Sequence, residues 1–156
     1  MERIRRIHAD GGLTGSGVYS DAAVVDLGEV YRITFAGLVA VDPVTGVVAG
    51  YETHNGEFAR DALEKQVADV FRQLERLMEA ASREIGRPLG LGDLTEALVF
   101  LREDYPLVMQ RFNECYAREF GKRGVGQYPV RTTVLKAIPP APAALVEIRF
   151  EAVVAK

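Results

Sequence analysis

An arginine and a glutamate near the end of the chain are the residues best suited to chemistry on a small substrate. Arg131 stands in YPVRTTV, where a strand is expected to begin, and its planar guanidinium can bind a carboxylate through two hydrogen bonds. Glu147 stands in LVEIR, in the next expected strand, and could accept a proton or orient a water molecule. An arginine and a glutamate on neighbouring strands can equally form an ordinary cross-strand ion pair. Both interpretations stay open at this point.

The residue patterns of other common reactions are missing. His8 and His54 lie far apart in the sequence, with no cysteine or histidine at metal-ligand spacing, which argues against a zinc site. The chain has neither a glycine-rich phosphate motif nor a GxSxG nucleophile motif. Its one cysteine, Cys115, falls on the apolar stripe of an expected helix, where a small buried hydrophobic side chain is the ordinary role.

Two segments have the period of an amphipathic helix. The first runs from residue 58 to about residue 85, and glycine and proline in residues 86–90 end it. Its apolar residues recur every three or four positions, at Leu63, Val67, Val70, Leu74, Leu77 and Ala81. The second runs from about residue 106 to residue 120, with Pro106 expected at the first helical position.

The remaining apolar segments are typical of strands. They cover residues 24–28, 30–36, 94–101, 130–138 and 145–155, and a turn is expected at 42–46. The resulting order, β-β-α-β-α-β-β, predicts an α+β fold with a mixed β-sheet and two helices packed on one face. No third helix is expected for the other face, so we expect a second subunit to cover it.

Length and composition predict a single globular domain over residues 1–156. The chain is 48% hydrophobic and 26% charged, with a formal net charge of −3 that argues against binding nucleic acid through the overall field. A charged N-terminus, a single cysteine and the lack of a long apolar run predict a cytoplasmic protein with no membrane segment.

Several motifs in a fixed order resemble the Rid family, the YjgF-like reactive intermediate/imine deaminases. Residues 17–22 read GVYSDA, residues 30–46 read VYRITFAGLVAVDPVTG, and residues 112–116 read FNECY. The most specific match joins YPVR at 128–131 to Ile138-Pro139 and then to VEI at 146–148. The resemblance extends from about residue 15 to residue 155.

The resemblance implies a chorismate-mutase-like, YjgF-like fold that assembles as a homotrimer with clefts between subunits. It implies an enamine/imine deaminase that hydrolyses reactive 2-imino acids of the 2-aminoacrylate type to 2-oxo acids and ammonia. The activity would be that of a 2-iminobutanoate/2-iminopropanoate deaminase, with no metal or organic cofactor. Its expected partners are a small 2-imino or 2-oxo acid and further copies of the chain.

The resemblance also assigns roles to five residues. Arg131 would hold the substrate carboxylate and Glu147 would position the attacking water, while Tyr19 and Asn113 would line the cleft. Gly37 would offer its backbone N–H to the substrate. Structural alternatives are a loop cap for Tyr19, a solvated helix position for Asn113 and an ion pair for Glu147.

Departures from the family pattern leave two alternative functions open. Ala36 replaces a serine whose hydroxyl would contact substrate, and Thr133 replaces a frequent cysteine. Residues 82–91 and 121–128 form longer segments than is usual in the family. One alternative is a non-catalytic trimer that binds a small carboxylate and regulates a partner. The other is an endoribonuclease, against which the acidic net charge and the lack of a Lys/Arg run argue.

Overall fold

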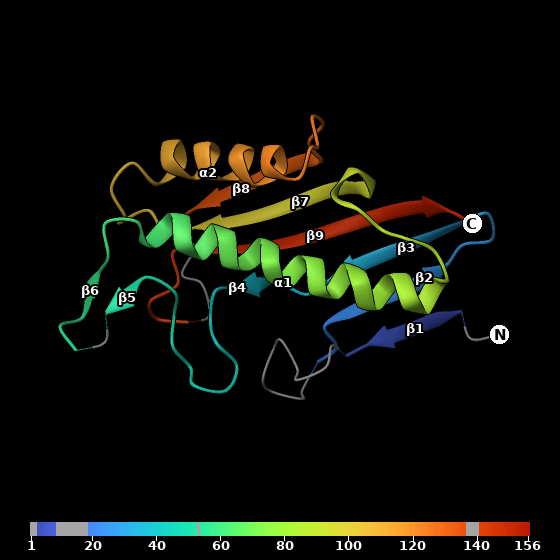
Figure 1. The fold of residues 1–156 in the computed structure, drawn as a ribbon, viewed down its shortest axis with the longest axis horizontal. Coiled ribbons are helices and arrows are strands. Elements are labelled where there is room, and N and C mark those ends of the chain that lie inside the picture. Colours follow the sequence, from blue (N-terminus) through green and yellow to red (C-terminus); the bar gives the residue numbers. More distant parts are fainter. Residues whose placement is uncertain (1–2, 9–18, 53, 137–140) are drawn as a thin grey trace.

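The structure, a computed structural model, describes residues 3–8, 19–52, 54–136 and 141–156 (Figure 1). Its elements in chain order are β1 (Ile4–Ile7), β2 (Ala22–Asp26), β3 (Val30–Phe35), β4 (Leu38–Val39), β5 (Tyr51–Glu52), β6 (Glu57–Phe58), α1 (Ala62–Ile85), the short 3-10 helix η1 (Leu91–Asp93), β7 (Leu94–Leu101), α2 (Val108–Lys122), β8 (Val130–Leu135) and β9 (Val146–Ala155). The predicted strand end at Ile138 and the motif residues 17–18 lie outside the described residues.

One mixed sheet carries most of the strands and confirms the predicted α+β fold. Its order is β1-β2-β3-β9-β7-β8, with β4 also paired to β9. The β7–β8 pair is parallel and the other pairs are antiparallel. The last strand of the chain, β9, therefore lies in the middle of the sheet, between β3 and β7.

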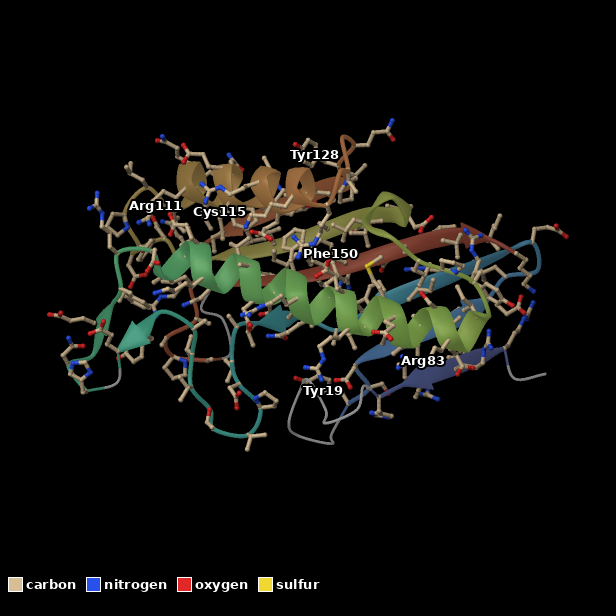
Figure 2. All side chains as sticks on the ribbon, in the orientation of Figure 1. Tyr19, Arg83, Arg111, Cys115, Tyr128 and Phe150 are labelled. Atoms are coloured by element: carbon tan, nitrogen blue, oxygen red, sulfur yellow. The ribbon has the colours of Figure 1, made fainter. Side chains whose placement is uncertain are left out.

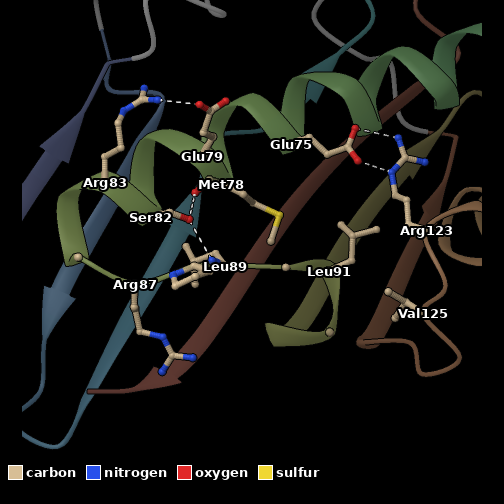
Figure 3. A pocket seen from close by; sticks show the side chains of 14 residues that line it. Glu75, Met78, Glu79, Ser82, Arg83, Arg87, Leu89, Leu91, Arg123 and Val125 are labelled. Carbon is tan, nitrogen blue, oxygen red and sulfur yellow. Dashed lines mark hydrogen bonds and ion pairs between the residues drawn. The ribbon is translucent and has the colours of Figure 1, made fainter.

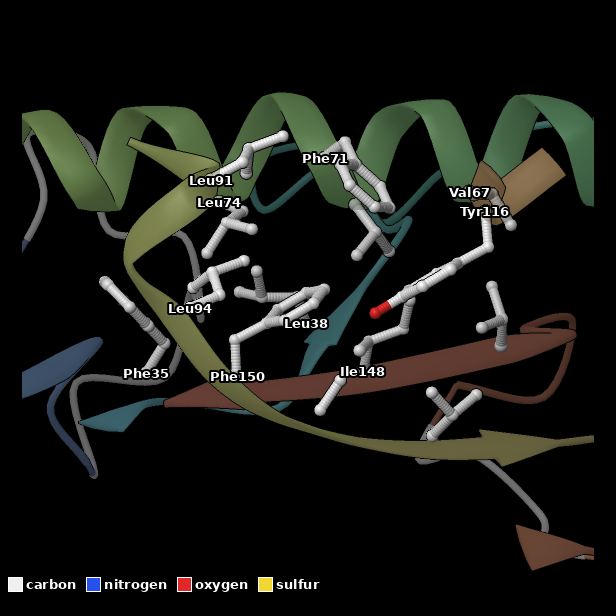
Figure 4. Packing of buried hydrophobic residues seen from close by; sticks show 14 of the residues in the cluster. Phe35, Leu38, Val67, Phe71, Leu74, Leu91, Leu94, Tyr116, Ile148 and Phe150 are labelled. Carbon is white, nitrogen blue, oxygen red and sulfur yellow. The ribbon is translucent and has the colours of Figure 1, made fainter. Parts of the chain in front are cut away.

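Both helices pack on the same face of this sheet, as predicted. In β9 the even-numbered side chains from Val146 to Val154 are buried, and this alternation defines the covered face. Figure 4 shows Phe71 and Leu74 of α1 pointing toward Ile148 and Phe150 of β9. The hydrophobic core therefore lies between the helical layer and the central strands.

Helix α1 begins four residues later than the sequence pattern predicts. Phe58 belongs to the two-stranded hairpin β5–β6, where its ring packs against Tyr51 at 5.3 Å between centroids. The helix ends at Gly86, which adopts the left-handed conformation with φ 72°. Glycine tolerates this conformation without a Cβ clash, so the predicted end is confirmed.

Helix α2 begins after Leu107, so the prediction that Pro106 occupies the first helical position is wrong. Leu107 caps the helix with a positive φ of 54°, and it is 69% exposed. The carbonyl of Tyr105 accepts the backbone N–H of Val108. This local turn sets the start of the helix, and Pro106 lies within the turn.

The strand β2 lies two residues earlier than predicted, whereas β3 begins at Val30 as predicted. β2 covers Ala22–Asp26 rather than residues 24–28, because Asp26 accepts the backbone N–H of Gly28 and closes a turn before β3. The strands β1, β4, β5 and β6 were not predicted. Each is short, so periodicity over so few residues is a weak signal.

No element of the described residues covers the second face of the sheet. This face carries the side chains that alternate with the buried ones along each strand. They include half-buried Leu98 and Phe100 of β7 and exposed Val134 of β8. A charged network of Arg32, Glu151 and Arg149 crosses the same face, with an Arg32–Glu151 distance of 3.1 Å. Apolar side chains on an open sheet face are what the expectation of a covering second subunit requires.

Candidate functional site

Arg131 lies on β8 beneath α2, where three α2 side chains hold its guanidinium. Its Nη2 donates a hydrogen bond to Asn113 Oδ1 at 2.8 Å. Its Cζ lies 5.4 Å from the ring centroid of Phe112 and 5.2 Å from that of Tyr116. The side chain is half-buried and forms no ion pair within the described residues. Arg131 is therefore a positioned cation whose charge remains available to an anion.

The sheet register explains why Arg131 faces the helix. Arg131 pairs with Ala97 of β7, a fully buried residue on the helix-covered face. Residues directly opposite in a sheet share a face, so Arg131 points toward α2. On α2, Phe112 and Tyr116 are four residues apart and hence lie on one side of the helix.

Glu147 lies on β9 and points to the uncovered face. It pairs with Phe100 of β7 and with Val39 of β4. Burial raises the pKa of the Glu147 carboxyl above the usual glutamate range. Within the described part of the chain, no hydrogen-bond donor or cation contacts this carboxylate. The carboxylate is thus free to act on a bound molecule.

Gly37 lies directly against the Glu147 side chain. A Cβ placed on Gly37 would be 2.0 Å from Glu147 Oε1 and 3.0 Å from its Cδ. The 2.0 Å distance is shorter than any real Cβ contact, so only glycine permits the observed position of the carboxylate. Gly37 and Glu147 therefore form one local arrangement.

Tyr19 lies at the same end of the first hairpin as Gly37. The carbonyl of Asp21, two residues after Tyr19, accepts the backbone N–H of Ala36 at 2.8 Å. The Tyr19 side chain is 53% exposed. Figure 2 shows Tyr19 beside the first strands of the sheet, whereas Tyr128 lies next to α2.

The five predicted site residues thus form two separate groups in one chain. Arg131 and Asn113 lie on the helix-covered face at the β8 edge, whereas Glu147 and Gly37 lie on the opposite face. The expectation that Arg131 and Glu147 occupy neighbouring strands is wrong, because β7 lies between β8 and β9. An ion pair across adjacent strands is thereby excluded as the role of this arginine and glutamate.

Phe112 and Tyr116 were noted from the sequence only as part of the FNECY motif, and the structure places both rings against Arg131. The signal was present, since two aromatic residues four apart flank Asn113. Burial raises the pKa of the Tyr116 hydroxyl, which has no hydrogen-bond partner within the described residues. Thr133 is half-buried and shares the face of Arg131, two residues further along β8.

A hollow of the described structure lies elsewhere. It has a volume of about 790 Å³ and lies between the end of α1 and residues 86–92 (Figure 3). Ion pairs Glu75–Arg123 and Glu79–Arg83 flank its apolar floor, which includes Met78. None of the five predicted site residues lines this hollow.

The described residues lack a metal-binding cluster and a membrane-spanning helix. They contain no group of three or more histidine, cysteine or acidic side chains placed to hold a metal ion. No helix among them combines the length and apolar character needed to cross a membrane.

The mixed sheet with two helices on one face defines a class of small α+β proteins, here with an arginine held in place at the sheet edge. A sequence model of one family, described as endoribonuclease L-PSP, matches residues 13–154. The chain therefore belongs to this family, the YjgF/Rid family.

Solved structures agree with the family assignment. A Thermotoga maritima protein, described provisionally as an endoribonuclease, is 25% identical, with a TM-score of 0.67 and coverage of 100% of both chains. RidA from an Antarctic Psychrobacter is 23% identical, with a TM-score of 0.64 over 96% of this chain and 99% of that one. E. coli TdcF with bound serine is 22% identical, with a TM-score of 0.60 over 99% and 100%. No curated protein sequence matches the chain.

Proposed function

We propose that the protein is a homotrimeric imine deaminase that hydrolyses small 2-imino acids to 2-oxo acids and ammonia. Its site would form between subunits, with Arg131 and Asn113 from one copy facing Glu147, Gly37 and Tyr19 from the next. The observation that carries this proposal is the separation of the two groups onto opposite faces of one sheet. The Arg131 group would bind a carboxylate and the Glu147 group would activate water, and imine hydrolysis needs both.

Arg131 would bind the substrate carboxylate. A guanidinium presents its donors in a plane that matches the two oxygens of a carboxylate. Asn113 and the aromatic rings already hold this plane in the absence of substrate. Preorganisation of this kind lowers the entropic cost of placing the imine carbon beside the second group.

Glu147 would orient and deprotonate water. Its raised pKa makes the carboxylate a stronger base than an exposed glutamate. Water oxygen bonds to the imine carbon, and the proton from water passes through Glu147 to the nitrogen. The hydroxyl proton of the resulting carbinolamine then passes by the same carboxylate to the nitrogen as the C–N bond breaks, which releases ammonia and leaves the carbonyl of the 2-oxo acid.

Mixing two inactive variants tests both the chemistry and the shared site. Arg131→Ala and Glu147→Gln are each expected to abolish turnover of imines generated in situ, leaving only the spontaneous release of ammonia. After joint unfolding and refolding in equal amounts, random trimers should recover about a quarter of wild-type activity. A site is active only where one subunit supplies an intact Arg131 and its neighbour supplies an intact Glu147. In a random trimer each condition holds for about half of the subunits, so about a quarter of the sites are active.

The controls separate the proposal from its alternatives. Arg131→Lys should lose about 30- to 1000-fold in kcat/KM, since an ammonium lacks the planar fork. If mixing restores nothing while both variants fold as trimers, the site is not shared between subunits. If the wild type never exceeds the spontaneous rate, the chain is not a deaminase for the imines tested.

A carboxylate-binding protein without catalysis is the second candidate, and Ala36 favours it. The family serine is absent, and the Ala36 backbone N–H is already used by the Asp21 carbonyl. The wild type would then bind 2-oxobutanoate but leave imine hydrolysis unaccelerated. Titration calorimetry beside the ammonia assay distinguishes this function from the deaminase.

A further inference from the structure

The Arg131 guanidinium lies against an aromatic surface, which we name the aromatic seat and define as the rings of Phe112 and Tyr116. The guanidinium carbon is within 5.4 Å of both ring centroids. A cation this close to a ring face is attracted by the ring quadrupole, and the attraction increases as water is excluded. Phe112 is fully buried and Tyr116 nearly so. The seat is therefore a dry contact on one side of the cation.

The rings of the seat are themselves fixed. Their centroids are 5.4 Å apart, a consequence of the four-residue spacing on α2. Tyr116 also packs edge-on against Phe71 of α1 at 5.8 Å. Movement of either ring would disturb the contact between the two helices, so the seat is rigid relative to the core.

Asn113 supplies a second constraint on the same cation. The seat contacts the guanidinium from one side, and the Asn113 bond to Nη2 restricts its rotation against the rings. Nε and Nη1 have no acceptor within the described residues. These two groups are the donors that remain for a carboxylate.

We infer that Phe112 and Tyr116 are positioning residues that hold Arg131 in the orientation that binds a carboxylate. This inference rests on the proposed function for the identity of the ligand. It goes further in assigning affinity to residues that never contact the ligand. Without the seat, Arg131 would keep its charge but lose the fixed direction of its donors.

Phe112→Leu removes one ring while keeping an apolar side chain. The lost cation–π contact and the released rotation should weaken carboxylate binding by about 3- to 10-fold. KM should rise in proportion, whereas kcat should change less, because Glu147 is untouched. Phe150→Leu is the matched control, since Phe150 is equally buried and contacts Phe71 rather than Arg131.

The experiment measures 2-oxobutanoate binding by titration calorimetry for the wild type, Phe112→Leu and Phe150→Leu. It is combined with the Nε–Hε NMR signal of Arg131 in the wild type. A proton over ring faces should resonate upfield of an exposed arginine, and this signature needs no variant to fold. Weakened binding in Phe112→Leu alone, with the upfield signal, supports the inference.

Three results would overturn it: an Arg131 signal at the position of a free arginine, equal binding by both variants, or no binding by the wild type. The outcome is separate from that of the proposed function. A wild type that binds 2-oxobutanoate more tightly than Phe112→Leu yet releases no extra ammonia contradicts the deaminase and supports the positioning role of the seat. Deaminase activity with the same KM in the wild type and in Phe112→Leu contradicts the positioning role of the seat.

Discussion

Glycine at position 37 illustrates how one residue can matter for function more than for stability. The space that a side chain would fill is already taken by the Glu147 carboxylate. The obstructing atoms are the far end of a flexible side chain, so a larger residue would displace the carboxylate rather than the backbone. A side chain at position 37 would thus prevent the Glu147 carboxylate from taking its observed position.

Gly37→Ala is expected to lower kcat/KM by at least about 10-fold with a small change in the free energy of unfolding. The added methyl group forces Glu147 away from its position beside the backbone. Gly92→Ala is the matched control, because a Cβ at Gly92 meets no atom within 4 Å. Imine hydrolysis assays and urea unfolding would check both; a fully active Gly37→Ala would show that this position of Glu147 is not needed.

Glu147→Gln should stabilise the protein at pH 7 while it removes activity. A carboxyl whose pKa is raised by folding favours the folded state when protonated, and this contribution is lost as the pH rises through the folded-state pKa. The Tm advantage of the glutamine variant should therefore shrink as the pH falls below about 4, where the carboxyl becomes protonated in the unfolded state as well. Calorimetric scans across this range would test it, and a lower Tm for the variant at pH 7 would mean that a cation or donor stabilises the carboxylate.

At the scale of elements, α1 is tied to the start of β9 by a buried glutamine. Gln66 donates from Nε2 to the Ala143 carbonyl at 3.1 Å, and its Oε1 accepts the Leu145 N–H at 2.7 Å. Gln66 is fully buried, so water cannot replace either bond. This side chain therefore fixes the entry of the chain into its central strand, on which the placement of Glu147 depends.

Gln66→Leu should lower the free energy of unfolding by about 2–4 kcal/mol, since it leaves a buried carbonyl and a buried N–H without partners. Arg72→Leu on the exposed side of the same helix is the comparison, and its change should be within about 0.5 kcal/mol. Urea unfolding monitored by circular dichroism measures both. Equal stability of the two variants would show that the segment before β9 is held by other contacts.

At the scale of the whole molecule, the uncovered sheet face implies association. Half-buried Leu98 and Phe100 and exposed Val134 lie on this face, which no helix or strand of the described part of the chain covers. Exposed apolar surface that is interspersed with paired charges is typical of a subunit interface. The same association would bring the two groups of site residues together.

Ultracentrifugation should therefore find a species of three times the 17.1 kDa chain mass at micromolar concentration. Val134→Glu would place an unpaired charge in the interface and should shift the protein toward monomers while the helix content is kept. Val44→Glu, at an 89% exposed loop position, should leave the mass unchanged. A wild type of 17 kDa alone would exclude the shared site.

Local sequence patterns determined the helices, the longer strands and the family. The stripe from Leu63 to Ala81 needs only its own periodicity to predict a helix, and Gly86 marks its end by backbone preference. The resemblance likewise named Arg131, Asn113, Gly37 and Glu147 from their motifs. These features depend on neighbours in the chain, which is why they can be read without the fold.

Only the tertiary structure decided which of these residues meet. β9 pairs between β3 and β7, and this long-range pairing places Glu147 on the face opposite Arg131. The alternation within β9 indicates which of its side chains face the core, but its pairing partners are strands far away in sequence, which no local pattern specifies. The contact of Gly37 with Glu147 and the aromatic seat under Arg131 depend in the same way on segments far apart in sequence, because their energy arises from packing between elements.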